Sequence, residues 1–183
     1  MNWISRIFGQ SYRELKTTSS LVGLALLTAM SIVLSFFLRI DLGPQLRVGV
    51  AFVCTGLMGM IYGPVAAGLA AGVGDVVKYL IRPTGPYFFG FTLNTILAGV
   101  VYGLLLYRGK RSLVRVAAAK TLVNVLLNGL LNTYWLSMLY GDAYGVLLLP
   151  RLGKNLVMLA VEIPLLYLVL KATAPVLERM KKL

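Results

Sequence analysis

The stretch GVLLLPRLGKNLVMLAVEIPLLYLVLK, residues 145–171, is long and apolar enough to cross a lipid bilayer. About 20 residues, rising 1.5 Å each in a helix, span the hydrocarbon core. This stretch nevertheless carries Arg151, Lys154 and Glu162, which share one face at helical spacing. A charge inside a membrane span costs at least about 2.5 kcal/mol, so such a face usually points into a helix bundle or a wet cavity. Arg151 and Lys154 could snorkel to the headgroups, but Glu162 is too deep and needs a partner or a ligand.

The composition places the whole chain among membrane proteins. Of its 183 residues, 58% are hydrophobic and only 13% are charged, and the mean hydropathy is +0.82. These values are typical of a multi-span membrane protein and not of a soluble domain. The uncharged run from residue 48 to 74 is interrupted by Gly63-Pro64, because proline fits only the first turn of a helix.

We therefore expect an all-α, polytopic membrane protein that forms one domain over residues 1–183, a compact bundle of six transmembrane helices. The expected helices cover residues 18–38, 48–62, 64–81, 88–107, 112–140 and 146–172. Residues 1–17 are expected to form an interfacial segment, because apolar residues recur there at helical spacing. Residues 39–47 are expected to form a polar loop, and residues 173–183 a basic tail.

The distribution of Lys and Arg predicts the orientation. With the N-terminus inside, twelve of the 18 basic residues fall on the inner side and six on the outer side, which favours cytoplasmic termini. This topology also explains most of the net charge of +12, so nucleic acid is not an expected partner. The outer six indicate an anionic ligand on that side; they are Arg39, Arg47, Lys78, Arg82, Arg151 and Lys154.

Polar side chains on four of the expected helices fall at similar depths, toward the outer half of the bundle. They are Asp75, Asn94, Asn128, Asn132 and Glu162. Interhelical hydrogen bonding explains any one of the asparagines, but it explains the two carboxylates and the basic outer rim less well. A proton or ion pathway is a competing use of the carboxylates. Aromatic residues flank the same region and would stack a flat ring or form an interfacial belt; they include Phe36, Phe88, Phe89 and Trp135.

Enzymatic and metal chemistry receive little support from the sequence. The chain has no His and a single Cys, so a zinc site of the usual kind or a Cys–His pair cannot form within it. The stretch GLLLYRGK, residues 103–110, departs from a phosphate-binding loop in its spacing, and Arg111 stands where Ser or Thr would bind Mg²⁺. We expect no cofactor and no catalysis, and a membrane enzyme is the least favoured alternative.

Several segments together resemble the folate-specific substrate-binding (S) component of energy-coupling factor (ECF) vitamin transporters. They are RPTGPYFFGFTLN at 82–94, GVVYGLLLY at 99–107, NTYW at 132–135, residues 151–162, and the small-residue pair Ala25 and Ala29 on the first helix. The resemblance implies a prokaryotic, multi-pass plasma-membrane protein that captures folate outside. It also implies a transmembrane coupling protein and two ABC ATPase subunits as partners, with Ala25 and Ala29 facing the coupling protein.

The predicted side chains suit this ligand. A carboxylate of Asp75 or Glu162 can pair with the amino-amide edge of a pterin, and asparagine amides can serve its remaining donors and acceptors. The dianionic glutamate tail would be bound by Arg82, Arg151 and Lys154. Two alternatives remain open: an S component for another anionic vitamin such as pantothenate, and a membrane scaffold whose polar residues only hold helices together.

Overall fold

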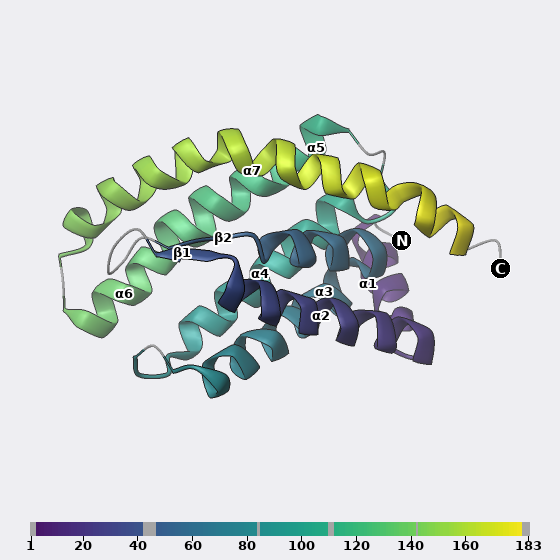
Figure 1. The fold of residues 1–183 in the computed structure, drawn as a ribbon, viewed down its shortest axis with the longest axis horizontal. Coiled ribbons are helices and arrows are strands. Elements are labelled where there is room, and N and C mark those ends of the chain that lie inside the picture. The colour runs from purple at the N-terminus through teal and green to yellow at the C-terminus, as the bar shows by residue number, and fades with distance from the viewer. Residues whose placement is uncertain (1–2, 42–46, 84, 110–111, 142, 181–183) are drawn as a thin grey trace.

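The computed structural model describes residues 3–41, 47–83, 85–109, 112–141 and 143–180, which are helical apart from one short β-ladder and the connecting turns. The elements in chain order are α1 (Trp3–Glu14), α2 (Thr18–Phe37), β1 (Arg39–Asp41), β2 (Arg47–Gly49), α3 (Phe52–Ile81), α4 (Phe89–Leu106), α5 (Leu113–Leu122), the π-helix η1 (Val123–Leu131), α6 (Asn132–Tyr140) and α7 (Tyr144–Met180). Both termini lie at one end of the bundle, and the β-ladder lies toward the other (Figure 1).

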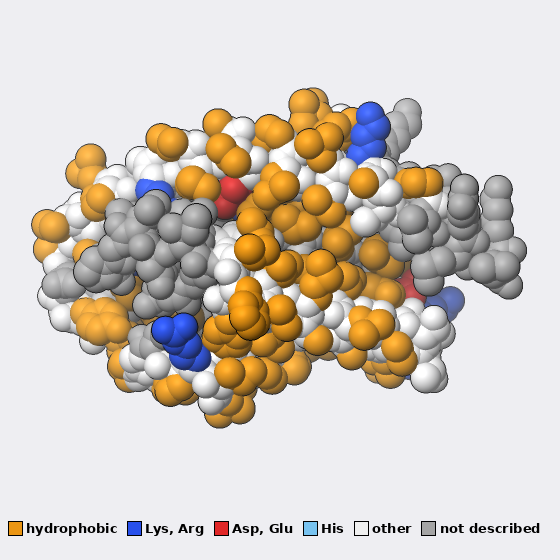
Figure 2. Space-filling model, viewed as in Figure 1, with side chains coloured by type: hydrophobic (Ala, Val, Ile, Leu, Met, Phe, Trp, Pro, Cys, Tyr) orange, Lys and Arg blue, Asp and Glu red, His pale blue; other side chains and the backbone are white. Residues whose placement is uncertain are grey.

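Five stretches of these helices are long and apolar enough to cross a membrane: Thr18–Phe37, Phe52–Ile81, Phe89–Leu106, Leu113–Tyr140 and Tyr144–Thr173. Hydrophobic side chains cover much of the described part of the face seen in Figure 2, where Lys and Arg appear at only a few places. Only 11% of the most apolar window of α2 is buried inside the protein. An apolar exterior of this kind is expected of a protein whose solvent is lipid.

Helix α3 is a helical hairpin that turns at Gly63. This residue has φ 82° and ψ −175°, a conformation that favours glycine, and Pro64 follows it as the first residue of the second half. Thr55 and Met58 before the turn line the same small cavity as Ala70 after it, so the two halves lie side by side. They correspond to the two predicted helices at 48–62 and 64–81. The first half begins later than predicted, at Phe52, because residues 47–49 pair with β1 instead.

Ser11 of α1 caps the second half of this hairpin. Its hydroxyl Oγ donates to the carbonyl oxygen of Tyr62 at 2.7 Å and accepts from the backbone N–H groups of Val65 (3.0 Å) and Ala66 (3.1 Å). The first N–H groups of a helix have no partner within the helix, so an outside oxygen satisfies them. Here that oxygen comes from a different helix, and Ser11 is completely buried as a result.

A second contact ties α1 to the same end of the bundle. Glu14 Oε2 accepts from Ser20 Oγ at 2.8 Å, and Glu14 Oε1 accepts from the Tyr107 hydroxyl at 3.4 Å. Burial raises the pKa of Tyr107, so this hydroxyl stays protonated and remains a donor. Helix α1 is therefore an integral part of the bundle end, and it contacts the residues that follow α4 and begin α2.

The second half of α3 packs against α4 at backbone distance. A Cβ atom on Gly99 would lie 2.6 Å from the carbonyl oxygen of Ala67, and one on Gly103 would overlap the backbone of Pro64. Gly99 and Gly103 therefore serve the close packing of two helices inside the bundle.

Two further segments differ from the predictions. The expected polar loop at 39–47 includes part of an antiparallel ladder, in which Arg39 pairs with Gly49 and Asp41 with Arg47. Helix α7 continues past the predicted end at 172 as far as Met180. The helix predicted at 112–140 is continuous, but its middle third is the π-helix η1.

Candidate functional site

Four aromatic rings form a row between the first turns of α4 and the helix α6. The ring centroids are 5.7 Å apart for Phe91 and Phe88, 5.6 Å for Phe88 and Trp135, and 5.2 Å for Trp135 and Tyr134. We call Phe88, Phe91, Tyr134 and Trp135 the aromatic row. Offset and tilted ring packing at these separations is favourable. The row places two predicted ligand-stacking residues, Phe88 and Trp135, in direct contact with each other.

Asn94 fixes the orientation of Trp135. Its side-chain oxygen accepts from the indole Nε1 of Trp135 at 3.3 Å, and its Nδ2 donates to the carbonyl oxygen of Leu127 at 3.3 Å. Asn94 is 6% exposed, so both halves of its amide are used inside the protein. We predicted that Asn94 would contact a ligand directly. That contact stays a prediction; in this structure the Asn94 amide holds the indole with its polar edge satisfied and leaves the ring faces for packing.

Asp75 belongs to a second cluster, between α3 and α4. Its Oδ2 accepts from Thr92 Oγ1 at 2.8 Å, and the Tyr87 hydroxyl lies 2.9 Å from the same Thr92 oxygen. Thr92 and Asn94 are two positions apart on α4, so their side chains point about 200° apart around the helix axis. Asp75 and Trp135 therefore contact opposite sides of α4.

Glu162 belongs to a third cluster, between α5, η1 and α7. Its Oε2 lies 3.3 Å from Lys120 Nζ and accepts from Asn124 Nδ2 at 2.6 Å. The Lys120 ammonium also lies 3.4 Å from the ring centroid of Phe52, the first residue of α3. The side chains of Lys120 and Glu162 are 2% and 13% exposed. Glu162 thus has the partner that its depth in the membrane requires, and that partner is Lys120.

The asparagines around Glu162 join the π-helix to its neighbours. Asn128 Nδ2 donates to Asn124 Oδ1 at 3.3 Å, and Asn155 Nδ2 donates to the Asn124 carbonyl oxygen at 3.2 Å. The Asn124 carbonyl that accepts from Asn155 belongs to η1. The Leu127 carbonyl, also in η1, accepts a hydrogen bond from Asn94.

The other predicted site residues lie around these clusters. Arg82 and Phe89 are exposed at the end of α3 and the start of α4, whereas Phe36 and Asn132 are half-buried and Asn128 is exposed. Arg151 and Lys154 are half-buried on α7, and Lys154 lies within electrostatic reach of Arg151 and Glu162. The side chains of Arg39 and Arg47 lie outside the described residues.

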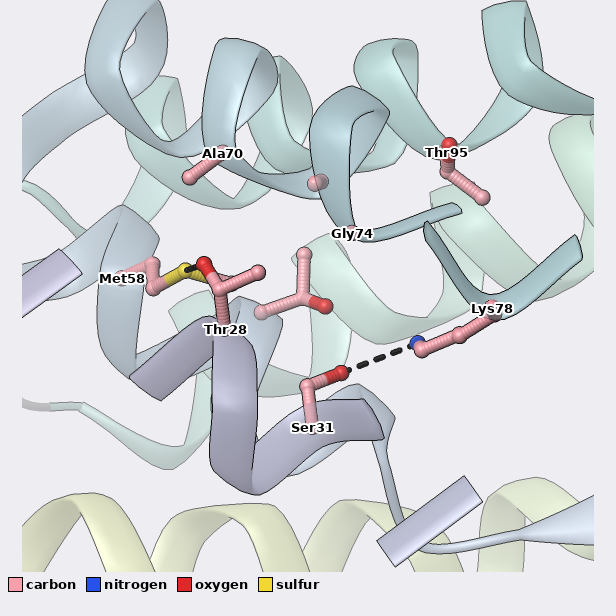
Figure 3. A pocket seen from close by; sticks show the side chains of 9 residues that line it. Thr28, Ser31, Met58, Ala70, Gly74, Lys78 and Thr95 are labelled. Carbon is pink, nitrogen blue, oxygen red and sulfur yellow. Dashed lines mark hydrogen bonds between the residues drawn. The ribbon is translucent and has the colours of Figure 1, made fainter. Parts of the chain in front are cut away.

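A small cavity lies away from these residues, between α2, both halves of α3 and α4 (Figure 3). Its volume is about 40 Å³, which accommodates water molecules but no organic ligand. Lys78 Nζ donates to Ser31 Oγ at 3.0 Å beside it, and Thr28 Oγ1 lies 3.6 Å from Met58 Sδ. Lys78 was expected on the outer surface, but in the described structure its ammonium lies against α2. Within the same described ranges, no group of three or more His, Cys, Asp or Glu is placed to bind a metal.

Comparison with models of protein families shows the family of this chain. Residues 19–170 match the family model described as "ECF transporter, substrate-specific component". The chain belongs to this family. All three clusters lie inside the matched range, and the whole of α1 lies before it.

Individual relatives of this ECF family give a consistent picture. The chain is 35% identical over 153 residues to the folate transporter FolT of Clostridium novyi (strain NT), covering 84% of this chain and 88% of that protein. It is 34% identical over 160 residues to the folate transporter FolT of Leuconostoc mesenteroides subsp. mesenteroides, covering 84% of this chain and 85% of that protein. A crystal structure of FolT bound with folic acid matches with a TM-score of 0.75 at 37% identity, covering 82% of this chain and 90% of that one.

Proposed function

We propose that this chain is the folate-binding S component of an ECF-type importer. It captures folate from the outer side for ATP-driven uptake by partner subunits. Its likeness to folate transporters extends over more than four fifths of its length, and it includes a relative solved with folic acid. The chain itself hydrolyses no ATP and catalyses no reaction in this scheme. It is a multi-pass protein of the prokaryotic plasma membrane with both termini in the cytoplasm.

The observation that carries the proposal is the aromatic row with its fixed indole. Asn94 satisfies the polar edge of Trp135, so the ring presents an apolar face without leaving a buried N–H unpaired. Folate contains two flat rings, a pterin and an aminobenzoyl group, and both stack well on aromatic faces. Phe36 and Phe89 are proposed as further residues that stack on these rings.

Asp75 supplies the group that would read the pterin edge. A carboxylate can accept about four hydrogen bonds, and the structure uses one of these positions for Thr92. The positions left on the two oxygens can take two parallel bonds from an amino-amide edge, one to each oxygen. Asn94, Asn128 and Asn132 are the amides proposed for the remaining donors and acceptors of the ring, and Asn94 also orients Trp135.

The charged tail of folate needs cations near the mouth of the site. Arg82 is exposed at the end of α3, and Arg151 and Lys154 lie on the outer part of α7. Arginine binds carboxylates through two parallel hydrogen bonds, which suits the two carboxylates of the glutamate tail. Glu162 neutralises Lys120, and it remains the alternative carboxylate for the pterin edge.

Helix α2 is the surface proposed for the coupling protein. Ala25 and Ala29 are exposed on it, one helical turn apart, and small residues allow two helices to approach closely. The membrane coupling protein and two ABC ATPase subunits are the proposed partners, because the ECF family works as the substrate-specific part of such an assembly.

Isothermal titration calorimetry of the detergent-purified protein tests the ligand. We expect saturable binding of folic acid at nanomolar concentration and no competing heat from pantothenate. Tight binding of pantothenate with none of folic acid would assign the protein to a different vitamin. Failure to bind either, in protein shown to be folded and free of retained ligand, would favour a scaffold role.

A further inference from the structure

Helix α1 turns a cationic face away from the bundle. Ile7 and Ser11 face the bundle and are 6% and 0% exposed. The opposite face is made of exposed side chains of Arg6, Arg13 and, in the turn that follows, Lys16, with the exposed aromatic rings of Trp3 and Tyr12 at its margins. The Lys16 ammonium lies 5.2 Å from the centroid of the Tyr12 ring. Glu14, the acidic residue of this helix, is bonded to Ser20 and Tyr107 instead.

The contacts of α1 hold it at the level where the membrane-spanning helices end. Ser11 binds the turn at Gly63, midway through the α3 hairpin. Glu14 binds Ser20, in the first turn of the span Thr18–Phe37, and Tyr107, which directly follows the span Phe89–Leu106. All these points mark the same end of the bundle. The hydrocarbon core gives way to headgroups at the ends of such spans, so α1 lies at headgroup depth.

We propose that this face of α1 binds anionic phospholipid headgroups. Each Lys or Arg held near an anionic membrane surface is attracted to it, and Arg matches phosphate with paired N–H donors. Trp and Tyr are the aromatic residues enriched at this depth. The hydrogen bonds of Ser11 and Glu14 fix the rotation of α1 about its axis, so this face is held pointing away from the bundle. This surface is independent of the proposed vitamin.

Fluorescence of Trp3 tests the proposal in the full-length protein. The chain has two tryptophans, so Trp135→Phe leaves Trp3 as the sole reporter. The protein is reconstituted into phosphatidylcholine bilayers with a minor fraction of phosphatidylglycerol, and either lipid is brominated on its acyl chains to quench nearby indoles. We expect brominated phosphatidylglycerol to quench the Trp3 fluorescence strongly. The extent of quenching should correspond to a local fraction of this lipid around Trp3 that is roughly tenfold or more above its bulk fraction. At about 1 M salt, where the Debye length is about 3 Å, this enrichment should vanish.

Two triple variants separate a specific face from general positive charge. R6Q/R13Q/K16Q should lower the quenching by phosphatidylglycerol to that expected from its bulk fraction. The matched variant R108Q/R115Q/K171Q removes the same charge from exposed positions elsewhere and should retain the enrichment. Quenching in the parent protein that follows the bulk fraction at low salt would overturn the proposal, as would equal losses in the two variants. The salt titration needs no variant of α1, so a misfolded variant does not weaken the test.

Discussion

Lys120 Nζ lies 3.3 Å from Glu162 Oε2, and this buried pair joins α5 to α7 inside the bundle. Removing two charges from water costs several kcal/mol for each ion, so geometry and additional hydrogen bonds must compensate. Asn124 donates to the same carboxylate oxygen, and the Phe52 ring covers the ammonium. The pair explains how an acidic residue is accommodated at mid-depth of α7 without a ligand.

Breaking this pair from one side should be costly. We expect Lys120→Met to lower the free energy of unfolding by about 3–5 kcal/mol, because it leaves Glu162 as an uncompensated charge. Adding Glu162→Gln should recover most of the loss, since Gln can still accept from Asn124. Thermal unfolding in detergent measures both, with the exposed Lys171→Met as control. A double variant no more stable than the single one would show that the charges are not coupled.

The cap on the α3 hairpin gives a second prediction. Ser11→Ala removes one donor and one shared acceptor from a completely buried position and leaves the N–H groups of Val65 and Ala66 without that oxygen. We expect a loss of about 1–3 kcal/mol of stability. The exposed Ser19→Ala should change stability by less than about 0.5 kcal/mol. Equal thermal midpoints for the two variants would contradict the capping role.

Replacing a glycine by alanine should change the stability of the protein in opposite directions at two kinds of position. Gly99→Ala should destabilise the protein, because the new Cβ would lie 2.6 Å from the Ala67 carbonyl oxygen and push α3 and α4 apart. Gly153→Ala on α7 meets nothing within 4 Å, so it should stabilise the helix by up to about 1 kcal/mol. Thermal unfolding of the pair measures both signs. A destabilised Gly153→Ala with an unaffected Gly99→Ala would contradict this packing.

Asp75→Asn separates ligand binding from folding. The asparagine oxygen can still accept from Thr92, so we expect stability to change little. The loss of charge at the pterin edge should weaken folic acid binding by about 10-fold to 100-fold, a cost of roughly 1.4–2.8 kcal/mol. Calorimetric titration measures the change, with the exposed Arg115→Gln as a control. An unchanged dissociation constant would remove Asp75 from the site.

The architecture follows from local patterns in the sequence. Apolar runs of about 20 residues predict membrane helices, and Gly63-Pro64 predicts the break in the 48–81 segment, because both signals depend on a few neighbouring residues. The π-helix at 123–131 could not be predicted in this way. Its carbonyl groups accept hydrogen bonds from Asn94 and Asn155 on other helices. The residue pattern of one helix does not predict contacts between helices.

The site was predicted less completely because depth along a helix does not determine which side chains meet. Asp75, Asn94 and Glu162 were predicted at similar depths on three different helices. In the structure they belong to three separate clusters. Their partners Thr92 and Lys120 carry no sequence signal of their own: threonine is common in helices, and Lys120 resembles an ordinary inner-side cation. The adjacency of Phe88 and Trp135 likewise depends on how α4 packs against α6.

The central claim is that the aromatic row receives folate, and Trp135 reports on it directly. In a Trp3→Phe protein Trp135 is the only tryptophan, so its emission can be followed while folic acid is added. We predict saturable quenching at nanomolar folic acid, and none with pantothenate. An unchanged emission during a titration that calorimetry shows to be saturable would place the ligand away from Trp135. Absence of any response, in folded protein whose absorbance shows no retained folate, would contradict the proposed function itself.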